Sequence, residues 1–157
     1  GESFERIFDN AFPIWEKIMN PEQILDMRQW IINMIKMIAQ HLDKQKKEYY
    51  NELVENIKAL IQKDYAKFEN VSEITESFYI SKNHLNLIFK RQTGENIFDY
   101  LMKTRIYYAK QMLADTDMRV YEISEKIGYK STAYFTSVFK QFTGQTPKEY
   151  RVHKRLG

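Results

Sequence analysis

Apolar residues recur at steps of three and four along most of the chain, and this spacing places them on one face of an α-helix. The first such group is Phe4, Ile7, Phe8 and Phe12. Asn20 and Pro21 then have the order of a helix N-cap followed by the first helical residue. The helix that they predict carries a broad apolar stripe, formed by Ile24, Met27, Ile31, Met34, Ile35, Ile38 and Leu42.

A charged stretch, DKQKKE at 43–48, separates this stripe from a second run of apolar residues at helical spacing, between Leu53 and Tyr65. No stretch shows the strict alternation of a half-buried strand. Helix breakers are few, with five Gly and three Pro among 157 residues. The sequence therefore predicts an all-α fold.

From Ser72 the pattern changes to short helices connected by tight turns. We expect a helix at about 72–77, a turn at Tyr79 and Ile80, and a second helix capped by Ser81. This order of helix, tight turn and helix is that of a helix-turn-helix unit.

The same order returns as a helix at 120–127, a turn at Gly128 and a helix at about 131–142. Gly128 suits the left-handed conformation that ends a helix sharply. A longer helix at 98–113 joins the two units, and its inward residues are Leu101, Ile106, Ala109 and Leu113. The final segment TPKE, at 146–149, has the Thr, Pro and Glu of a capping box that opens one more helix.

The two units share a repeated sequence. FKRQTGENIFDY at 89–100 and FKQFTGQTPKEY at 139–150 carry Phe-Lys, Thr-Gly and a closing Tyr at the same offsets. Ile74 and Ile123 also align, and each is followed by a small residue, Thr75 or Ser124, where a second helix must pass close. We expect Gly94 and Gly144 to end helices and the aromatic residues of the repeat to lie in the core. These residues are Phe89, Phe98, Phe139, Phe142 and Tyr150.

Charge is distributed unevenly along the chain. Residues 1–53 carry seven Lys or Arg against nine Asp or Glu, a balance of −2, whereas residues 54–157 carry seventeen against twelve, a balance of +5. A basic excess in the repeated part suits a polyanionic partner. The chain has no Cys, which fits a reducing compartment, and we expect a cytoplasmic protein. No apolar run reaches the roughly 18 residues of a membrane span, so we expect no membrane contact.

The sequence gives little support for an enzyme. Its three histidines, His41, His84 and His153, lie far apart and have no ligand spacing. No Ser-His-Asp or Cys-His set is evident. We therefore expect no catalytic residues, no metal and no cofactor.

The segment GYKSTAYFTSVFKQFTGQTPKEYR resembles the C-terminal signature of AraC/XylS-type bacterial transcription regulators. Its matching elements are Gly128-Tyr129, Tyr134-Phe135, Phe139-Lys140, Gly144, Thr146-Pro147 and Tyr150-Arg151. Upstream, SKNHLNLIFK resembles that family's first recognition helix, and Arg105, Ala109 and Leu113 fit its linker helix. The resemblance covers about 55–155 and implies a DNA-binding domain of about seven helices.

The resemblance implies a division of the chain at residue 53. Residues 54–157 would form the DNA-binding domain, with a first helix-turn-helix at about 72–91, a linker helix at about 97–114 and a second helix-turn-helix at about 120–142. Each recognition helix would enter one of two successive major grooves. RNA polymerase is a further partner implied by the resemblance alone.

Outward side chains of the two recognition helices are the expected base readers: Lys82, Asn83, Asn86, Leu87, Thr132, Ala133 and Ser137. Asn pairs bidentately with adenine, whereas Leu87, where the family has a polar reader, could contact only a thymine methyl. The second helix has short side chains, so we expect phosphate contacts and shape reading more than base discrimination. Expected phosphate partners are Ser81, Lys90, Arg91, Lys130, Ser131, Tyr134 and Lys140. The alternative is that these residues form an ordinary solvated surface.

Residues 1–53 leave two interpretations open. The 24–42 stripe either approaches the heptad seam of a dimerisation helix or folds back on its helical neighbours as a small bundle, and its breadth favours the bundle. This segment loosely resembles the helical connectors that join a sensor domain to an AraC-type module. A second hypothesis for the whole chain is a helical protein-interaction module that has lost DNA binding.

Overall fold

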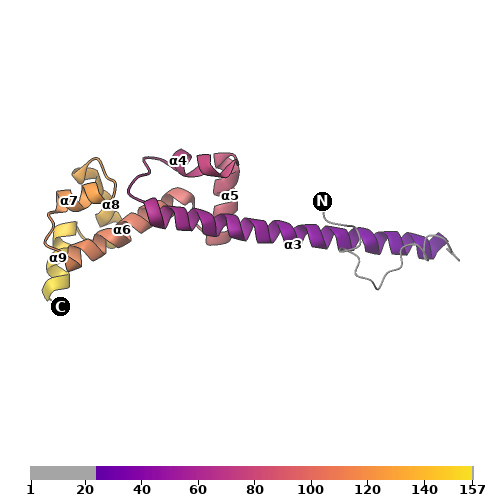
Figure 1. Cartoon of the computed structure of the whole chain (residues 1–157). Coiled ribbons are helices and arrows are strands. Elements are labelled where there is room, and N and C mark those ends of the chain that lie inside the picture. Colours follow the sequence, from indigo (N-terminus) through magenta and orange to yellow (C-terminus); the bar gives the residue numbers. More distant parts are fainter. Residues whose placement is uncertain (1–23, 157) are drawn as a thin grey trace. The chain divides into compact units, whose positions relative to one another are not determined.

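The computed structural model describes residues 24–156, and the side-chain surroundings of residues 27–154. The chain divides into two compact units, Gly1–Asn51 and Glu52–Gly157. Every regular element within the described residues is a helix, as predicted (Figure 1). The apolar group at 4–12 and the helix start at Asn20 and Pro21 lie outside the described residues. Among the described helices, none combines the length and apolar character that crossing a membrane requires.

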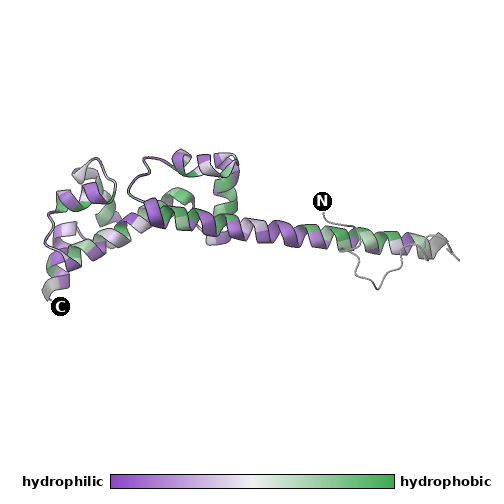
Figure 2. Cartoon of the chain, in the orientation of Figure 1, coloured by the Kyte–Doolittle hydropathy of each residue, from purple (hydrophilic) through white to green (hydrophobic). Residues whose placement is uncertain are grey.

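The first described helix, α3 (Ile24–Asp64), runs through the charged stretch 43–48 without interruption. The charged stretch that stands between the two apolar runs therefore lies within one helix. Figure 2 shows this hydrophilic stretch as part of one continuous ribbon. Lys, Gln and Glu are good helix formers, and no Gly or Pro interrupts them. A bundle formed with residues 1–23 would lie outside the described residues.

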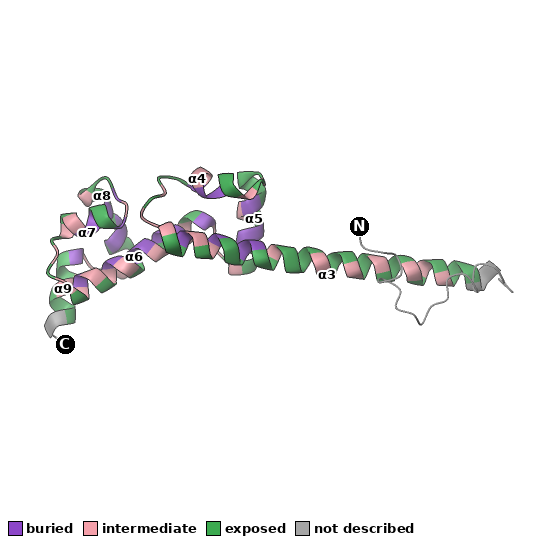
Figure 3. Ribbon diagram, viewed as in Figure 1, coloured by how far each residue is buried: buried purple, intermediate pink, exposed green. Residues whose placement is uncertain are grey.

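Burial differs between the two ends of α3. None of the side chains at 27–51 is buried, whereas Leu53, Val54, Ile57 and Ile61 are buried in the second unit (Figure 3). The end of α3 is fastened to that unit by a stack of Tyr65 on Tyr108, with 4.3 Å between ring centroids.

The first helix-turn-helix consists of α4 (Val71–Thr75), the short 3-10 helix η1 (Glu76–Phe78) and α5 (Lys82–Thr93). Asn70 caps α4, with its side-chain oxygen accepting from the backbone N–H of Ser72 at 2.8 Å. Gly94 ends α5 with φ +84°, as predicted. Ser81 occupies the N-cap position of α5, but its side chain makes no capping hydrogen bond.

The linker helix α6 (Ile97–Asp115) packs against α5 as well as against α7, α8 and α9. Its predicted inward residues are all buried: Leu101, Ile106, Ala109 and Leu113. Figure 1 shows α6 running from the first helix-turn-helix to the second. The core of the second unit is therefore built around this one helix.

The second helix-turn-helix consists of α7 (Val120–Lys126) and α8 (Thr132–Thr143), and α9 (Pro147–Leu156) follows. Gly128 has φ +88° in the turn, as predicted. The capping box of α9 is confirmed, because Thr146 N donates to Glu149 Oε2 at 2.7 Å and Glu149 N donates to Thr146 Oγ1 at 3.3 Å. The predicted small residues Thr75 and Ser124 are buried.

The repeated sequence produces a repeated structure. Phe89 packs edge-on against Tyr100, and Phe139 packs edge-on against Tyr150, each pair with 5.5 Å between ring centroids. Two other predicted core aromatics are wrong: Phe98 is 44% exposed and Phe142 is 39% exposed. These two rings lie in the first turn of α6 and the last turn of α8, so neighbouring elements do not enclose them on all sides.

Candidate nucleic-acid interface

One face of α5 is buried and the other is open. Leu85, Ile88 and Phe89 are buried, as predicted from their spacing. Along the helix and at its N-cap, the exposed residues are Ser81, Lys82, Asn83, His84, Leu87, Lys90, Arg91 and Gln92. Lys82 lies against the preceding helix, where its Nζ donates to Ser72 Oγ at 3.2 Å. The open face thus carries basic groups together with two amide side chains, one imidazole and one apolar side chain.

Asn86 differs from the prediction that it faces outward. It is half-buried, and its Oδ1 accepts from the backbone N–H of Ile97 at 3.2 Å. The first N–H groups of a helix have no acceptor within the helix, so the first N–H of α6 finds its acceptor in a side chain of α5. Asn83 is therefore the more accessible of the two predicted amide readers.

The predicted base readers on the outward face of α8 have short side chains. Ala133 and Ser137 are exposed, whereas Thr132 and Thr136 are half-buried, and Thr136 Oγ1 donates to the Thr132 carbonyl at 2.8 Å. Phe135, Val138 and Phe139 form the buried face, as predicted. These side chains extend only a short way from the helix towards a base edge.

The predicted phosphate partners around α8 are exposed but not equally available. Ser131 Oγ caps the helix by accepting from Tyr134 N at 3.3 Å. Lys130 Nζ pairs with Glu69 at 2.7 Å, so binding a phosphate would compete with this exposed ion pair. Tyr134 and Lys140 both lie on the open surface.

The charge of these two helices is one-sided. Neither α5 nor α8 contains an Asp or Glu, although the chain has 21 acidic residues. Basic residues lie within or just before both helices: Lys82, Lys90, Arg91, Lys130 and Lys140. No group of acidic or histidine side chains within the described residues is arranged to hold a metal ion. The arrangement therefore suits an anionic partner that is long enough to meet both helices.

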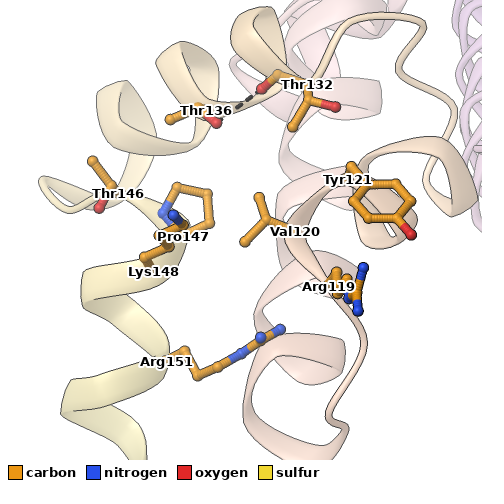
Figure 4. Close-up of a pocket in the computed structure, with 9 residues that line it drawn as sticks. All are labelled: Arg119, Val120, Tyr121, Thr132, Thr136, Thr146, Pro147, Lys148 and Arg151. Carbon is orange, nitrogen blue, oxygen red and sulfur yellow. Dashed lines mark hydrogen bonds between the residues drawn. The ribbon is translucent and has the colours of Figure 1, made fainter.

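A hollow of about 680 Å³ lies beside α8, between the start of α7 and the start of α9 (Figure 4). Its walls include Thr132 and Thr136 of α8, and the basic residues Arg119, Lys148 and Arg151 line it. Arg151 donates through Nη2 to the Met118 carbonyl, and its buried Nε has no hydrogen-bond partner among the described residues.

Arg119, Lys148 and Arg151 were not among the sequence-predicted contacts. A signal was nevertheless present, because Arg119 directly precedes a predicted helix start and Lys148 follows the proline that opens another. Their meeting in one hollow depends on how α7 packs on α8 and α8 on α9, which spacing along the chain does not show.

Two helix-turn-helix units on one linker helix, each with an acid-free second helix, define a double helix-turn-helix DNA-binding domain. A model of the helix-turn-helix domain family matches residues 74–153, which is half of the chain. The protein belongs to the AraC-type family of helix-turn-helix transcription regulators.

Individual proteins agree with this assignment. The HTH-type transcriptional regulator YtdP of Bacillus subtilis is 29% identical over 143 residues, 90% of this chain and 18% of YtdP. The C-terminal domain of the response regulator yesN from Fusobacterium nucleatum is 34% identical, with a TM-score of 0.59 over 62% of this chain and 95% of that one. The DNA-binding domain of AdpA, solved with a target DNA, shares the fold at 21% identity, with a TM-score of 0.63 over 66% of this chain and 93% of that one. The chain spans 18 to 37% of the length of the first curated relatives.

Proposed function

We propose that residues 54–157 bind double-stranded DNA in a sequence-specific manner, with α5 and α8 in successive major grooves. The observation that carries this proposal is the pair of acid-free helices, each buried on one face and open on the other. The major groove is wide enough to admit an α-helix. The likeness in fold to the AdpA domain, which was solved with its target DNA, supports the same conclusion.

The length of α6 is compatible with this arrangement. Its 19 residues span about 28 Å at ~1.5 Å per residue. Successive major grooves on one side of a duplex lie roughly 34 Å apart. Both α5 and α8 pack against α6, which runs from the first helix-turn-helix to the second (Figure 1). The width of a helix at each end therefore supplies the remaining distance.

The two recognition helices have different parts in this proposal. Asn83, with Lys82 and Leu87 beside it, reads bases from α5, and Asn86 contributes only through the amide hydrogens that its contact with Ile97 leaves over. Thr132, Ala133 and Ser137 of α8 read shape and thymine methyls.

The phosphates of the DNA backbone contact basic and hydroxyl side chains around these helices. Around α5 these are Ser81, Lys90 and Arg91, and around α8 they are Lys130, Ser131, Tyr134 and Lys140. The hollow beside α8 adds Arg119, Lys148 and Arg151. Such contacts supply affinity and register without carrying sequence information, which suits a helix with short side chains.

The location, oligomeric state and second partner of the protein are proposed from this activity. We propose a cytoplasmic regulator, because its ligand is genomic DNA, with residues 1–53 as a helical segment that dimerises. RNA polymerase is its second macromolecular partner. These parts rest on the family membership and on the exposed apolar stripe of α3.

The test is selection of bound duplexes from a random pool of about 30 base pairs, nearly three helical turns, at two salt concentrations. Two enriched blocks about one turn apart are expected from the 157-residue chain. A single enriched block would mean that α5 reads the base sequence and that α8 only positions the protein on the duplex. Binding that does not weaken with salt would contradict the proposal and favour a protein-interaction module, because phosphate contacts release counterions.

A further inference from the structure

Arg105 is a buried cation at the centre of the second unit. Its side chain projects from the middle of α6 and only 4% of the residue is exposed. No carboxylate forms an ion pair with it within the described residues. Two backbone carbonyls accept from it instead: Tyr65 O from Nε at 2.9 Å and Phe68 O from Nη2 at 2.6 Å.

The same guanidinium also meets the turn of the second helix-turn-helix. It lies 5.2 Å from the centroid of the Tyr129 ring, which is a cation–π contact. Gly128 leaves room for it, since a Cβ there would stand 2.8 Å from Arg105 Nη2. Tyr129 is itself fixed on α6, because its hydroxyl donates to Met102 Sδ at 3.2 Å.

These contacts join the segment just before the first helix-turn-helix to the turn inside the second. Phe68 stands two residues before Asn70, the N-cap of α4, and Tyr129 stands two residues before Ser131, the N-cap of α8. One planar group thus holds both segments against the same turn of α6. An exposed ion pair between Lys130 and Glu69 joins the same two segments a second time.

Burying this cation has an energetic cost that an apolar residue would not incur. Desolvation lowers the pKa of Arg105, as expected for a charge removed from water. Buried charges are often no more stabilising than well-packed apolar groups, but their directional hydrogen bonds select one geometry over its neighbours. Fixing the relative orientation of two segments is a role that accounts for this energetic cost.

We propose that Arg105 is a positioning residue that sets the distance and rotation between α5 and α8, and thereby the number of base pairs between the two sequence blocks that the protein reads. This inference rests on the proposed function. Each added base pair moves the second block by about 3.4 Å and rotates it by roughly 35° about the duplex axis. A rigid junction turns that displacement into lost affinity, whereas a loosened junction tolerates it.

The test uses the full chain and a set of duplexes that carry its two selected blocks at the preferred spacing and at one or two base pairs more or less. For the unaltered protein, we expect one base pair of change to weaken binding about tenfold, comparable to one mismatched base pair. For Arg105→Gln, we expect the same optimum with a penalty below about threefold. Binding to a duplex with the first block alone should not change.

Ile106→Val is the matched control, because it removes a buried methylene from the next position of α6 and no polar contact. Its spacing profile should equal that of the unaltered protein. If Arg105→Gln weakens every spacing and the single block by one common factor, the residue is only structural and the inference is overturned.

If Arg105→Gln does not fold, Tyr129→Leu decides the question. This change removes the aromatic contact but keeps both carbonyl partners of Arg105. A flattened spacing profile supports the inference, and an unchanged profile overturns it. If the unaltered protein itself shows no binding to two spaced blocks, the proposed function fails, and this result is distinct from either outcome for the variants.

Discussion

Gly128 lies so close to Ala66 that a Cβ at this position would stand 2.3 Å from the Ala66 carbonyl oxygen. Two backbone segments that are more than 60 residues apart in sequence therefore touch where the second helix-turn-helix meets the loop after α3. Gly128 also has φ +88°, a conformation that L side chains rarely adopt. Both the space and the backbone angle require glycine here.

Gly128→Ala should therefore destabilise the protein strongly. Positive φ costs a non-glycine residue about 1–3 kcal/mol, and the contact with backbone atoms forces a further displacement. We expect a total loss of about 3 kcal/mol or more in the free energy of unfolding. Urea unfolding followed by circular dichroism measures this loss.

Gly94→Ala and Gly144→Ala are the matched controls. These glycines have φ +84° and +77°, but no atom lies within 4 Å of a Cβ built on either. Each should cost only the backbone term, about 1 kcal/mol. Equal losses in all three variants would show that the approach to Ala66 contributes nothing.

Local signals in the sequence were enough to predict most of this fold. Caps, glycine turns and apolar spacing act within a few residues, and they correctly located the two helix-turn-helix units and the capping box of Thr146 and Glu149. The charged residues at 43–48 stand between the two apolar runs of the sequence, but they favour helix and lie within α3.

The candidate site was less predictable, because its decisive contacts join distant residues. Asn86 turns inward to meet Ile97, eleven positions later, and Arg105 reaches carbonyls 37 and 40 positions earlier. Helical spacing shows which face of a helix is polar, but not which neighbour meets it. The exposed positions of Asn83 and Lys90 followed from spacing alone.

Asn83→Ala and Lys90→Ala should separate base reading from phosphate binding. We expect Asn83→Ala to lower affinity for the selected DNA by about 1–3 kcal/mol and to relax specificity at one position. Lys90→Ala should weaken binding to selected and random duplexes alike, because a phosphate contact carries no sequence information. Fluorescence anisotropy with both duplexes measures the two effects.

Asn86→Ala provides a contrast on the same helix. It leaves the N–H of Ile97 without its partner, so we expect a loss of about 1 kcal/mol in the free energy of unfolding. Equal losses on selected and random DNA for Asn83→Ala would contradict its role as a base reader.

Arg119→Gln and Lys148→Gln test the hollow beside α8. If each side chain neutralises one phosphate, each variant should reduce the slope of log affinity against log salt by about 0.9. The slope comes from binding titrations of one duplex over a range of salt concentrations. Lys58→Gln is the control, since it removes the same charge from α3, where Lys58 pairs with Glu55 at 2.8 Å. If the salt slopes of Arg119→Gln and Lys148→Gln equal that of the control, the hollow is not part of the DNA interface.

Tyr129 gives the stability of the second unit a pH dependence in alkali. Burial raises its pKa from 10.0 to about 12, an effect that Arg105 partly opposes. As pH rises, the unfolded chain therefore loses this proton before the folded protein does. The folded protein keeps its full free energy of unfolding below pH 10 and loses part of it as pH rises towards about 12. The loss amounts to about 2 kcal/mol.

The measurement is urea unfolding at several pH values across that window, for the unaltered protein and for Tyr129→Phe. The pKa of Tyr65 is also raised by burial, so only the difference between the two proteins reports Tyr129. The variant should lose less stability with rising pH. Parallel curves would show that Tyr129 ionises in the folded protein as readily as in the unfolded chain.

The last prediction concerns the apolar stripe of α3. Ile35 and Leu42 are 57% and 56% exposed and lie seven residues apart, and Tyr49 continues this series. Ile31 and Ile38 form a second series at the same interval. Interleaved seven-residue series are the seam of a coiled coil, and water-exposed isoleucine and leucine gain stability when a second copy covers them.

We therefore expect sedimentation experiments to give about twice the chain mass of 19.0 kDa for the unaltered protein. The double variant Ile35→Asp with Leu42→Asp should sediment as a monomer, because it places charges in the seam. Gln40→Asp, an exposed position outside both series, should remain dimeric. A monomeric unaltered protein would exclude this dimer, and a double variant that still dimerises would place the interface elsewhere. Binding to a duplex with a single block should be the same for all three proteins, since the contacts that read DNA lie in the other unit.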